Sequence, residues 1–266
     1  MRRRGFTITE LLVVISTITL LSGILAPVLS AARHQTKALV CSSNIKQLTL
    51  ALTIYEQENG TFPYGFDDST AVKPPGGYPG SGTRDLQGWW WFHFLTDTLG
   101  ENFDKDTTFW CPSRNVEDPY ILCGNYGVNQ AICKNARKIG NSEFFGTPLA
   151  LNRIRRPAAT LLVVDSGYSL ISWRAATNAN LPDSRFENTR REGAFYVPGL
   201  TLNKERFLEE TISPAHEQDA IDGRHPNKTV NVGFADSHTA YLKADDLCIE
   251  QINDSYYNLS PLWLPR

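Results

Sequence analysis

An apolar run near the N-terminus constrains this 266-residue chain more than any other feature. Between Leu11 and Leu29 the residues are aliphatic except for one alanine, one glycine, one proline and a few serines and threonines. A helix of about 20 apolar residues, rising 1.5 Å per residue, crosses the hydrocarbon core of a bilayer. The basic residues Arg2 to Arg4 precede the run and favour a cytoplasmic N-terminus. The sequence therefore predicts a membrane-spanning helix at 6–29, with the rest of the chain outside.

The residues before this run differ from an ordinary secretory signal, whose small-residue cleavage site follows its apolar core. Here the small-residue junction, Gly5-Phe6, comes before the core, and one acidic residue, Glu10, stands at its edge. This arrangement resembles the leader of type IV prepilins and pseudopilins, in which a prepilin peptidase cuts after the glycine and methylates the new N-terminal residue. The resemblance implies a leader at 1–5 and methylation of Phe6.

Glu10 has two interpretations. A carboxylate near hydrocarbon costs a few kcal/mol unless it finds a partner, and one interpretation is that headgroups solvate it at the membrane edge. The other, which the leader resemblance favours, is that Glu10 pairs with the amine of Phe6 in a neighbouring subunit. Opposite charges attract strongly at low dielectric, so this pair would set the register of subunits. The membrane and other pilin-like subunits are then the expected partners.

The helical pattern continues beyond the apolar run. Apolar residues recur at intervals of three or four: Cys41, Ile45, Leu48, Leu52 and Tyr55. Gly60 then supplies a helix stop. The sequence predicts one helix from 6 to about 58, bent near Pro27, whose extension at 30–60 packs on a globular domain. The alternative is two helices joined by a loop around Ser30, and the helix-forming residues that follow favour continuity.

The charge balance excludes one class of partner. Lysine and arginine total 26 against 28 acidic residues, and removal of the leader would take away three arginines. The chain has no excess of basic residues of the kind that binds nucleic acid, so no nucleic-acid partner is expected.

The cysteine count is odd, so at least one thiol is free or pairs between chains. The five are Cys41, Cys111, Cys123, Cys133 and Cys248. Cys111, Cys123 and Cys133 lie near one another in the sequence, which predicts one disulfide among these three without deciding the pair. A zinc site is the rival interpretation, although the spacing lacks a CxxC knuckle.

Two segments have strand patterns. Thr160 to Val164 is a short β-branched and leucine run typical of a buried strand. Later, apolar residues alternate with polar or small ones at Val230, Val232 and Phe234. Asp236 and Ser237 form a turn, and Thr239 to Leu242 returns as a second strand. The sequence predicts a C-terminal hairpin within 224–243.

Metal-ligating residue types gather at this hairpin. His225, Asp236 and His238 are possible ligands for calcium or zinc, and Asp165 could join them from the neighbouring strand. The favoured alternative is that His225 and Asp236 bond each other or backbone groups and pin the hairpin to the sheet. No nucleophile elbow, phosphate loop or paired metal-binding histidines on a helix occur in the sequence. We therefore expect no catalytic residues and no resident cofactor.

The stretch from Ala31 to Gly65 resembles the N-terminal part of a bacterial pseudopilin-like family, the DUF1559-like family. That family has a prepilin leader and a C-terminal His-x9-Asp-Gly element. The matching positions are Cys41, Asn44, Lys46, Gln47, Leu48, Tyr55, Gly60, Phe62 and Pro63. Later similarities occur at Trp110 to Ser113, Asn125 to Asn129 and Pro157 to Asp165.

The C-terminal element departs from the family pattern twice. Ten residues separate His225 from Asp236, and Ser237 replaces the glycine. Glycine adopts positive φ in such turns and serine does so poorly. The sequence therefore predicts a different turn type, with the extra residue in a bulge or a longer loop at Pro226-Asn227.

Together these features predict an α+β, pilin-like fold, in which a long N-terminal helix lies on a mostly antiparallel sheet. The globular domain at 61–266 would carry loop-rich insertions, the longest at about 172–222. The resemblance implies a structural subunit of a type IV pilus or type II secretion-like system. It would be a single-pass inner-membrane protein whose globule is periplasmic or on the cell surface. The alternative is a membrane-anchored binding domain or a metal-dependent hydrolase using His225, Asp236 and His238.

Overall fold

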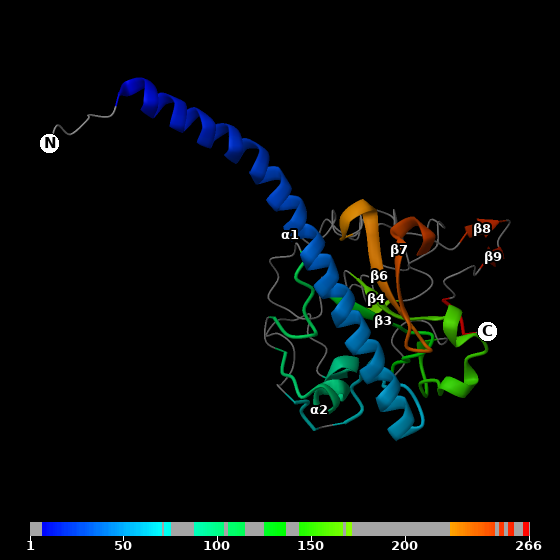
Figure 1. Cartoon of the computed structure of the whole chain (residues 1–266). Coiled ribbons are helices and arrows are strands. Elements are labelled where there is room, and N and C mark those ends of the chain that lie inside the picture. Colours follow the sequence, from blue (N-terminus) through cyan, green and yellow to red (C-terminus); the bar gives the residue numbers. More distant parts are fainter. Residues whose placement is uncertain are drawn as a thin grey trace, which may run out of the picture.

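The computed structural model describes residues 7–70, 72–75, 88–103, 106–114, 125–136, 144–166, 169–171, 224–247, 250–252, 255–257 and 263–265. The predicted leader at 1–5 and the predicted insertion at about 172–222 lie outside these residues. One long helix and a mostly antiparallel sheet make up the described fold, which is α+β as predicted (Figure 1).

Helix α1 (Ile8–Asn59) is continuous over 52 residues and passes through Pro27. Its start is a capping box, because the Thr7 hydroxyl accepts from the Glu10 amide and the Glu10 carboxylate accepts from the Thr7 amide. It ends at Gly60, whose φ of 77° is the left-handed conformation that glycine adopts readily. The predicted single helix and its stop are confirmed, and the alternative with a loop around Ser30 is wrong.

The second half of α1 lies on the sheet, and its first half projects away from the globule (Figure 1). The predicted apolar stripe faces the core, where Cys41, Ile45, Leu48 and Leu52 are fully buried. Tyr55 packs at the edge of the same cluster. Helical spacing thus placed the buried face of α1 correctly.

The main sheet has the strand order β5-β3-β4-β6-β7, and only the β3–β5 pair is parallel. Its strands are β3 (Tyr126–Asn129), β4 (Leu161–Asp165), β5 (Leu170–Ile171), β6 (Thr229–Phe234) and β7 (Thr239–Lys243). The buried strand predicted at 160–164 is β4, and the predicted hairpin is β6–β7. These two strands pair from Thr229 opposite Lys243 to Gly233 opposite Thr239.

Shorter elements surround this sheet. The pairs β1 (Phe66–Asp67) with β2 (Trp89–Trp90) and β8 (Glu250–Ile252) with β9 (Ser255–Tyr257) are antiparallel. The short helices are α2 (Thr96–Leu99) and the 3-10 turns η1 (Trp91–Leu95), η3 (Leu151–Arg153), η4 (Pro157–Ala159), η7 (Pro226–Lys228) and η8 (Ala244–Leu247). The aromatic stretch at 90–92 is buried and fills the core beside α1.

At Gly233, β6 packs tightly against α1. A Cβ built at this position would collide with the Thr49 hydroxyl and lie 2.8 Å from a methyl carbon of Val163. We expect Gly233→Ala to lower the free energy of unfolding by about 1–3 kcal/mol, because overpacking forces the helix and sheet apart. Gly23→Ala in the free half of α1 is the control, since a Cβ there meets nothing within 4 Å. Equal denaturation midpoints for the two variants would contradict this account of the α1–β6 contact.

Candidate functional site

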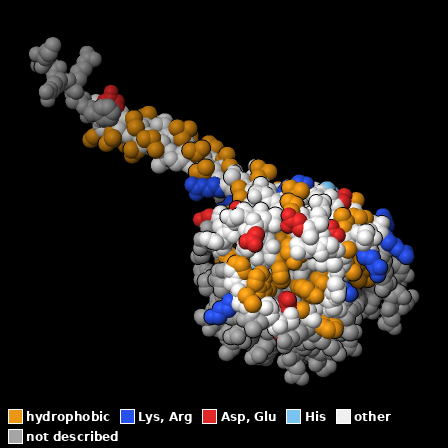
Figure 2. All heavy atoms as spheres, turned by 90° about the horizontal axis from the view of Figure 1, so that it is seen from below, with side chains coloured by type: hydrophobic (Ala, Val, Ile, Leu, Met, Phe, Trp, Pro, Cys, Tyr) orange, Lys and Arg blue, Asp and Glu red, His pale blue; other side chains and the backbone are white. Residues whose placement is uncertain are grey.

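The first half of α1 is the most unusual surface of the protein. Its large apolar side chains are all exposed, as Figure 2 shows along the projecting segment. These are Ile8, Leu11, Leu12, Val13, Val14, Ile15, Ile18, Leu20, Leu21, Ile24, Leu25, Val28 and Leu29. By length and composition, α1 is a candidate membrane span or signal sequence. The membrane span predicted at 6–29 is therefore helical from Ile8 onward, and its large apolar side chains are not covered by the globule.

Glu10 stands at the start of this exposed segment. Its carboxylate Oε2 accepts hydrogen bonds from the Thr7 amide at 2.9 Å and from the Thr7 hydroxyl at 2.8 Å. Among the described residues, no lysine or arginine forms an ion pair with it. Gly5 and Phe6 lie outside the described residues. Within the described residues, the contacts that hold the carboxylate at the helix start are thus local ones with Thr7.

A second group of residues is buried behind α1, around Asp165 at the end of β4. The imidazole Nε2 of His225 donates to Asp165 Oδ2 at 2.8 Å, and both side chains are fully buried. The same oxygen accepts from the Asn231 amide at 2.6 Å and from Asn231 Nδ2 at 2.9 Å. Asp165 therefore connects β4 to β6 and to the segment that precedes β6.

Arg224 lies next to this pair. Its guanidinium donates to the carbonyl oxygens of Asn125 at 2.7 Å and Ser166 at 2.9 Å. Burial alone would raise the pKa of Asp165, but the charge and hydrogen bond of His225, with Arg224, hold that pKa below its ordinary value. Asp165 is thus an ionised carboxylate inside the core, compensated by its neighbours.

A disulfide joins Cys41 on α1 to Cys111, with the two Cα atoms 5.3 Å apart. The disulfide predicted among Cys111, Cys123 and Cys133 is therefore wrong: Cys133 is a buried free thiol, and Cys123 lies outside the described residues. Proximity in the sequence was misleading. Cys41 and Cys111 are 70 residues apart, but the packing of α1 on the globule places Cys41 next to the loop that contains Cys111.

The disulfide links the long helix covalently to the globule, and its removal should be costly. We expect the Cys41→Ser, Cys111→Ser double variant to lose about 2–4 kcal/mol of unfolding free energy, because the unfolded chain gains the freedom of a long loop. Chemical denaturation of wild type and variant checks this. Cys133→Ser is the control because its thiol is free. A double variant as stable as wild type would contradict the disulfide.

The residues predicted as one metal set fall into two places. His225 is buried before β6, whereas Asp236 and His238 are partly exposed in the turn after it. The six residues of β6 separate them by about 20 Å at 3.3 Å per residue. Asp236 bonds to the imidazole and amide of His238, and His238 stacks on Phe234. Of the two predicted alternatives, a bond between His225 and Asp236 is wrong, because Asp165 takes the place of Asp236. The other holds for Asp236, whose carboxylate accepts from the backbone amide of His238.

Ser237 occupies the turn in the left-handed conformation, with φ of 73°. The different turn type predicted from its lack of glycine is not needed, because contacts with α1 support the strained residue. Lys46 Nζ donates to its carbonyl oxygen at 2.6 Å, and its hydroxyl lies 2.8 Å from that of Thr53. At the other end of β6, Asn227 and its neighbour also have positive φ, in agreement with a longer loop there.

Comparison with known proteins supports the family resemblance for part of the chain. Residues 30–102 match the model of a family described as protein of unknown function (DUF1559). The matched range begins in α1 and includes Cys41, β1 and β2. The leader and the C-terminal element lie outside it. No curated protein and no solved structure matches the chain.

Proposed function

We propose that this protein is a pilin-like or pseudopilin structural subunit that assembles through α1 in a type IV pilus or type II secretion-like system. The observation that carries the proposal is the free half of α1, where apolar side chains are exposed along the helix. Exposed apolar surfaces of this extent mark contacts with membranes or other proteins. A subunit that moves from the membrane into a filament would use this apolar half of α1 first to contact lipid and then to contact neighbouring subunits.

Processing fits the start of the helix. In our proposal a prepilin peptidase cuts after Gly5 and methylates Phe6. The capping residue Thr7 immediately follows Phe6, so α1 begins almost at the new N-terminus. The new amine would then lie within a turn of Glu10, at the same end of the helix.

Glu10 has a specific role in this proposal. In the single chain its carboxylate caps its own helix through Thr7. In an assembly the amine of Phe6 from a neighbouring subunit would replace water as its partner. Because the surrounding apolar side chains exclude solvent, this ion pair is stronger than a surface pair. It opposes any shift of one helix along the next.

The location follows from the same features. We propose a single-pass inner-membrane protein whose N-terminus is cytoplasmic before processing and whose globule lies in the periplasm or on the cell surface. The arginines before α1 support this orientation. The Cys41–Cys111 disulfide supports an oxidising compartment for the globule.

The rival proposal, a hydrolase using His225, Asp236 and His238, has weaker support. These residues lie at opposite ends of β6, so they do not surround one substrate or metal. The side chains of the His225–Asp165 pair are fully buried, so they offer no exposed surface to a substrate. We infer that the protein is not an enzyme.

Site-specific photo-crosslinking in native membranes tests the assembly proposal. A photoreactive residue in place of Val13, on the free half of α1, should give adducts with this chain or another pilin-like subunit. The same residue in place of Val72, which is equally exposed on the globule, is the control. Adducts only with lipid at position 13 would favour an anchored domain and contradict assembly.

A further inference from the structure

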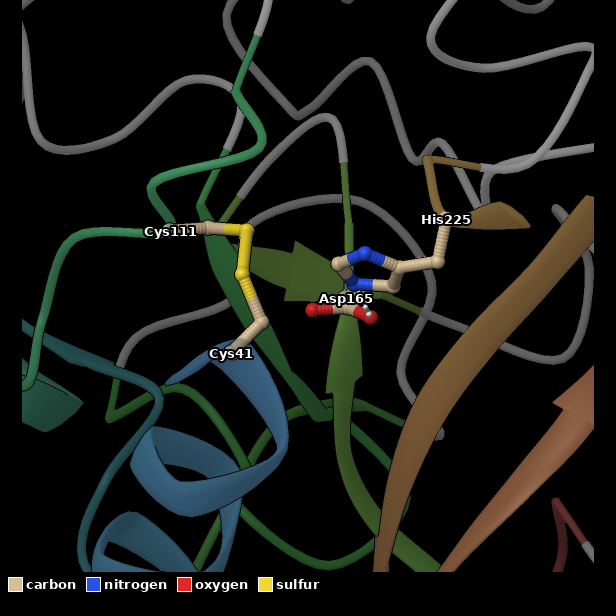
Figure 3. Close-up of side chains that lie close together, drawn as sticks. All are labelled: Cys41, Cys111, Asp165 and His225. Carbon is tan, nitrogen blue, oxygen red and sulfur yellow. Dashed lines mark hydrogen bonds and ion pairs between the residues drawn. A yellow bond between two sulfur atoms is a disulfide. The ribbon is translucent and has the colours of Figure 1, made fainter. Parts of the chain in front are cut away.

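Four potential metal ligands converge behind α1. The sulfurs of Cys41 and Cys111, a carboxylate oxygen of Asp165 and an imidazole nitrogen of His225 all lie within 4.8 Å of one another. All four residues are buried. Figure 3 shows them gathered from α1, the Cys111 loop, the end of β4 and the segment before β6. Residues far apart in the sequence thus supply two soft and two harder ligands to one space.

The polar atoms of this group are not fully used. Asp165 Oδ1, His225 Nδ1 and Asn231 Oδ1 are buried and have no hydrogen-bond partner among the described residues. Buried polar atoms are bonded in most native structures, and leaving one unpaired costs about 1–3 kcal/mol. Asp165 Oδ1 and His225 Nδ1 are therefore ligand atoms of this buried group that no hydrogen bond within the described residues occupies.

We propose that the reduced form of this centre binds one zinc-type divalent ion through Cys41, Cys111, Asp165 and His225. Two thiolates, an imidazole and a carboxylate are ligand types that zinc takes in tetrahedral sites. Bond lengths of about 2.0–2.3 Å place such ligands about 3.3–3.8 Å apart. Atoms that already lie within 4.8 Å of one another need only small side-chain movements to reach this geometry.

The disulfide controls this site. In the oxidised chain the two sulfurs are bonded to each other and carry no thiolate charge. An external dithiol supplies two electrons and two protons, the S–S bond breaks, and the dithiol itself becomes a disulfide. Each thiol then loses its proton to solvent as the metal binds. Disulfide and metal are thus alternative cross-links between α1 and the globule.

Metal uptake by the full-length chain in detergent micelles tests this inference. The protein is reduced with a phosphine, freed of the reductant without oxygen, and dialysed against Co²⁺ or Zn²⁺. We expect one ion per reduced chain by elemental analysis, thiolate-to-cobalt charge-transfer absorption for Co²⁺, and no stoichiometric ion in the oxidised chain. Uptake by the oxidised chain, or none by the reduced chain, would overturn the proposal.

Variants assign the ligands. We expect Cys41→Ser with Cys111→Ser to abolish uptake in either redox state, and Asp165→Asn and His225→Gln to weaken it at least tenfold. Cys133→Ser and His238→Ala are controls and should keep one ion, because neither residue belongs to the four-residue group. Loss of metal uptake in these controls alone, or retention of uptake in the double variant, would place the ion elsewhere.

Reduction of the disulfide could itself unfold the chain, and the test then uses refolding as its measurement. Refolding of the reduced chain on addition of Zn²⁺ supports the site, and failure to refold counts against it.

Discussion

Glu10→Ala is expected to abolish assembly of the protein while leaving cleavage after Gly5 largely intact. The variant buries the amine of Phe6 without a counter-charge, and an unpaired charge at low dielectric is strongly unfavourable. Each 1.4 kcal/mol lost at a subunit contact lowers its association constant about tenfold, so the defect multiplies along a filament. Loss of the helix cap costs only about 1 kcal/mol, so the subunit itself should remain folded.

Shearing of intact cells followed by quantification of assembled and membrane-bound protein measures this effect. Glu58→Ala is a matched control, because Glu58 is an exposed acidic residue near the other end of the same helix. The control should assemble like wild type. Normal assembly of the Glu10 variant would show that the carboxylate is only a membrane-edge residue solvated by headgroups.

The second large effect is expected at the buried ion pair. Asp165→Ala removes the acceptor of one imidazole bond and of two bonds from Asn231. Breaking a buried, hydrogen-bonded pair by removing one partner costs about 3–5 kcal/mol, because the remaining groups stay buried without compensation. We expect this loss of unfolding free energy, with separation of β6 from β4 as its structural consequence.

The hairpin turn provides the matched control. Asp236→Ala removes a carboxylate that also bonds to a histidine, but this pair is partly exposed. Exposed ion pairs contribute about 0–1 kcal/mol, so Asp236→Ala should change stability little. Urea denaturation of both variants makes the comparison. Similar losses of unfolding free energy in the two variants would contradict the account, because burial would then not explain the contribution of Asp165 to stability.

The local elements could be predicted from the sequence because their causes are local. Helical spacing from Cys41 to Tyr55, the stop at Gly60 and the alternation along β6 depend on neighbours a few residues away. The structure confirms the buried face and the stop of α1 and a strand at β6. The alternation suggested a half-buried strand, whereas β6 is buried on both faces from Val230 to Phe234. Even the single helix through Pro27 followed from the helix-forming residues after it.

The buried centre could be predicted only in part. The sequence placed Asp165 near His225, as the structure has them, but not Cys41 and Cys111, whose approach depends on which distant segments meet. Asp165 and His225 are 60 residues apart, and their contact requires the pairing of β4 with β6, which are distant in the sequence. One signal was present: Asp165 ends an apolar strand, where an acidic residue needs a buried partner. The position of Cys41 was a second signal. Because Cys41 lies on the apolar stripe of α1, its sulfur was expected to point into the core.

The hairpin turn shows how a local rule was overruled. Serine disfavours positive φ, yet Ser237 adopts it. The contacts from Lys46 and Thr53 on α1 compensate for the strain, and no pattern within the turn itself could reveal them. Packing against a distant helix therefore decided the local conformation.

The most direct test of the account is the N-terminus of the mature protein in purified membranes or sheared surface material. Peptide mass spectrometry distinguishes the two forms without any assay of function. The account predicts a chain that begins at Phe6 with an N-methylated amine and lacks residues 1–5. An intact Met-Arg-Arg-Arg-Gly start, with no methylphenylalanine, would contradict processing as a pilin-like subunit.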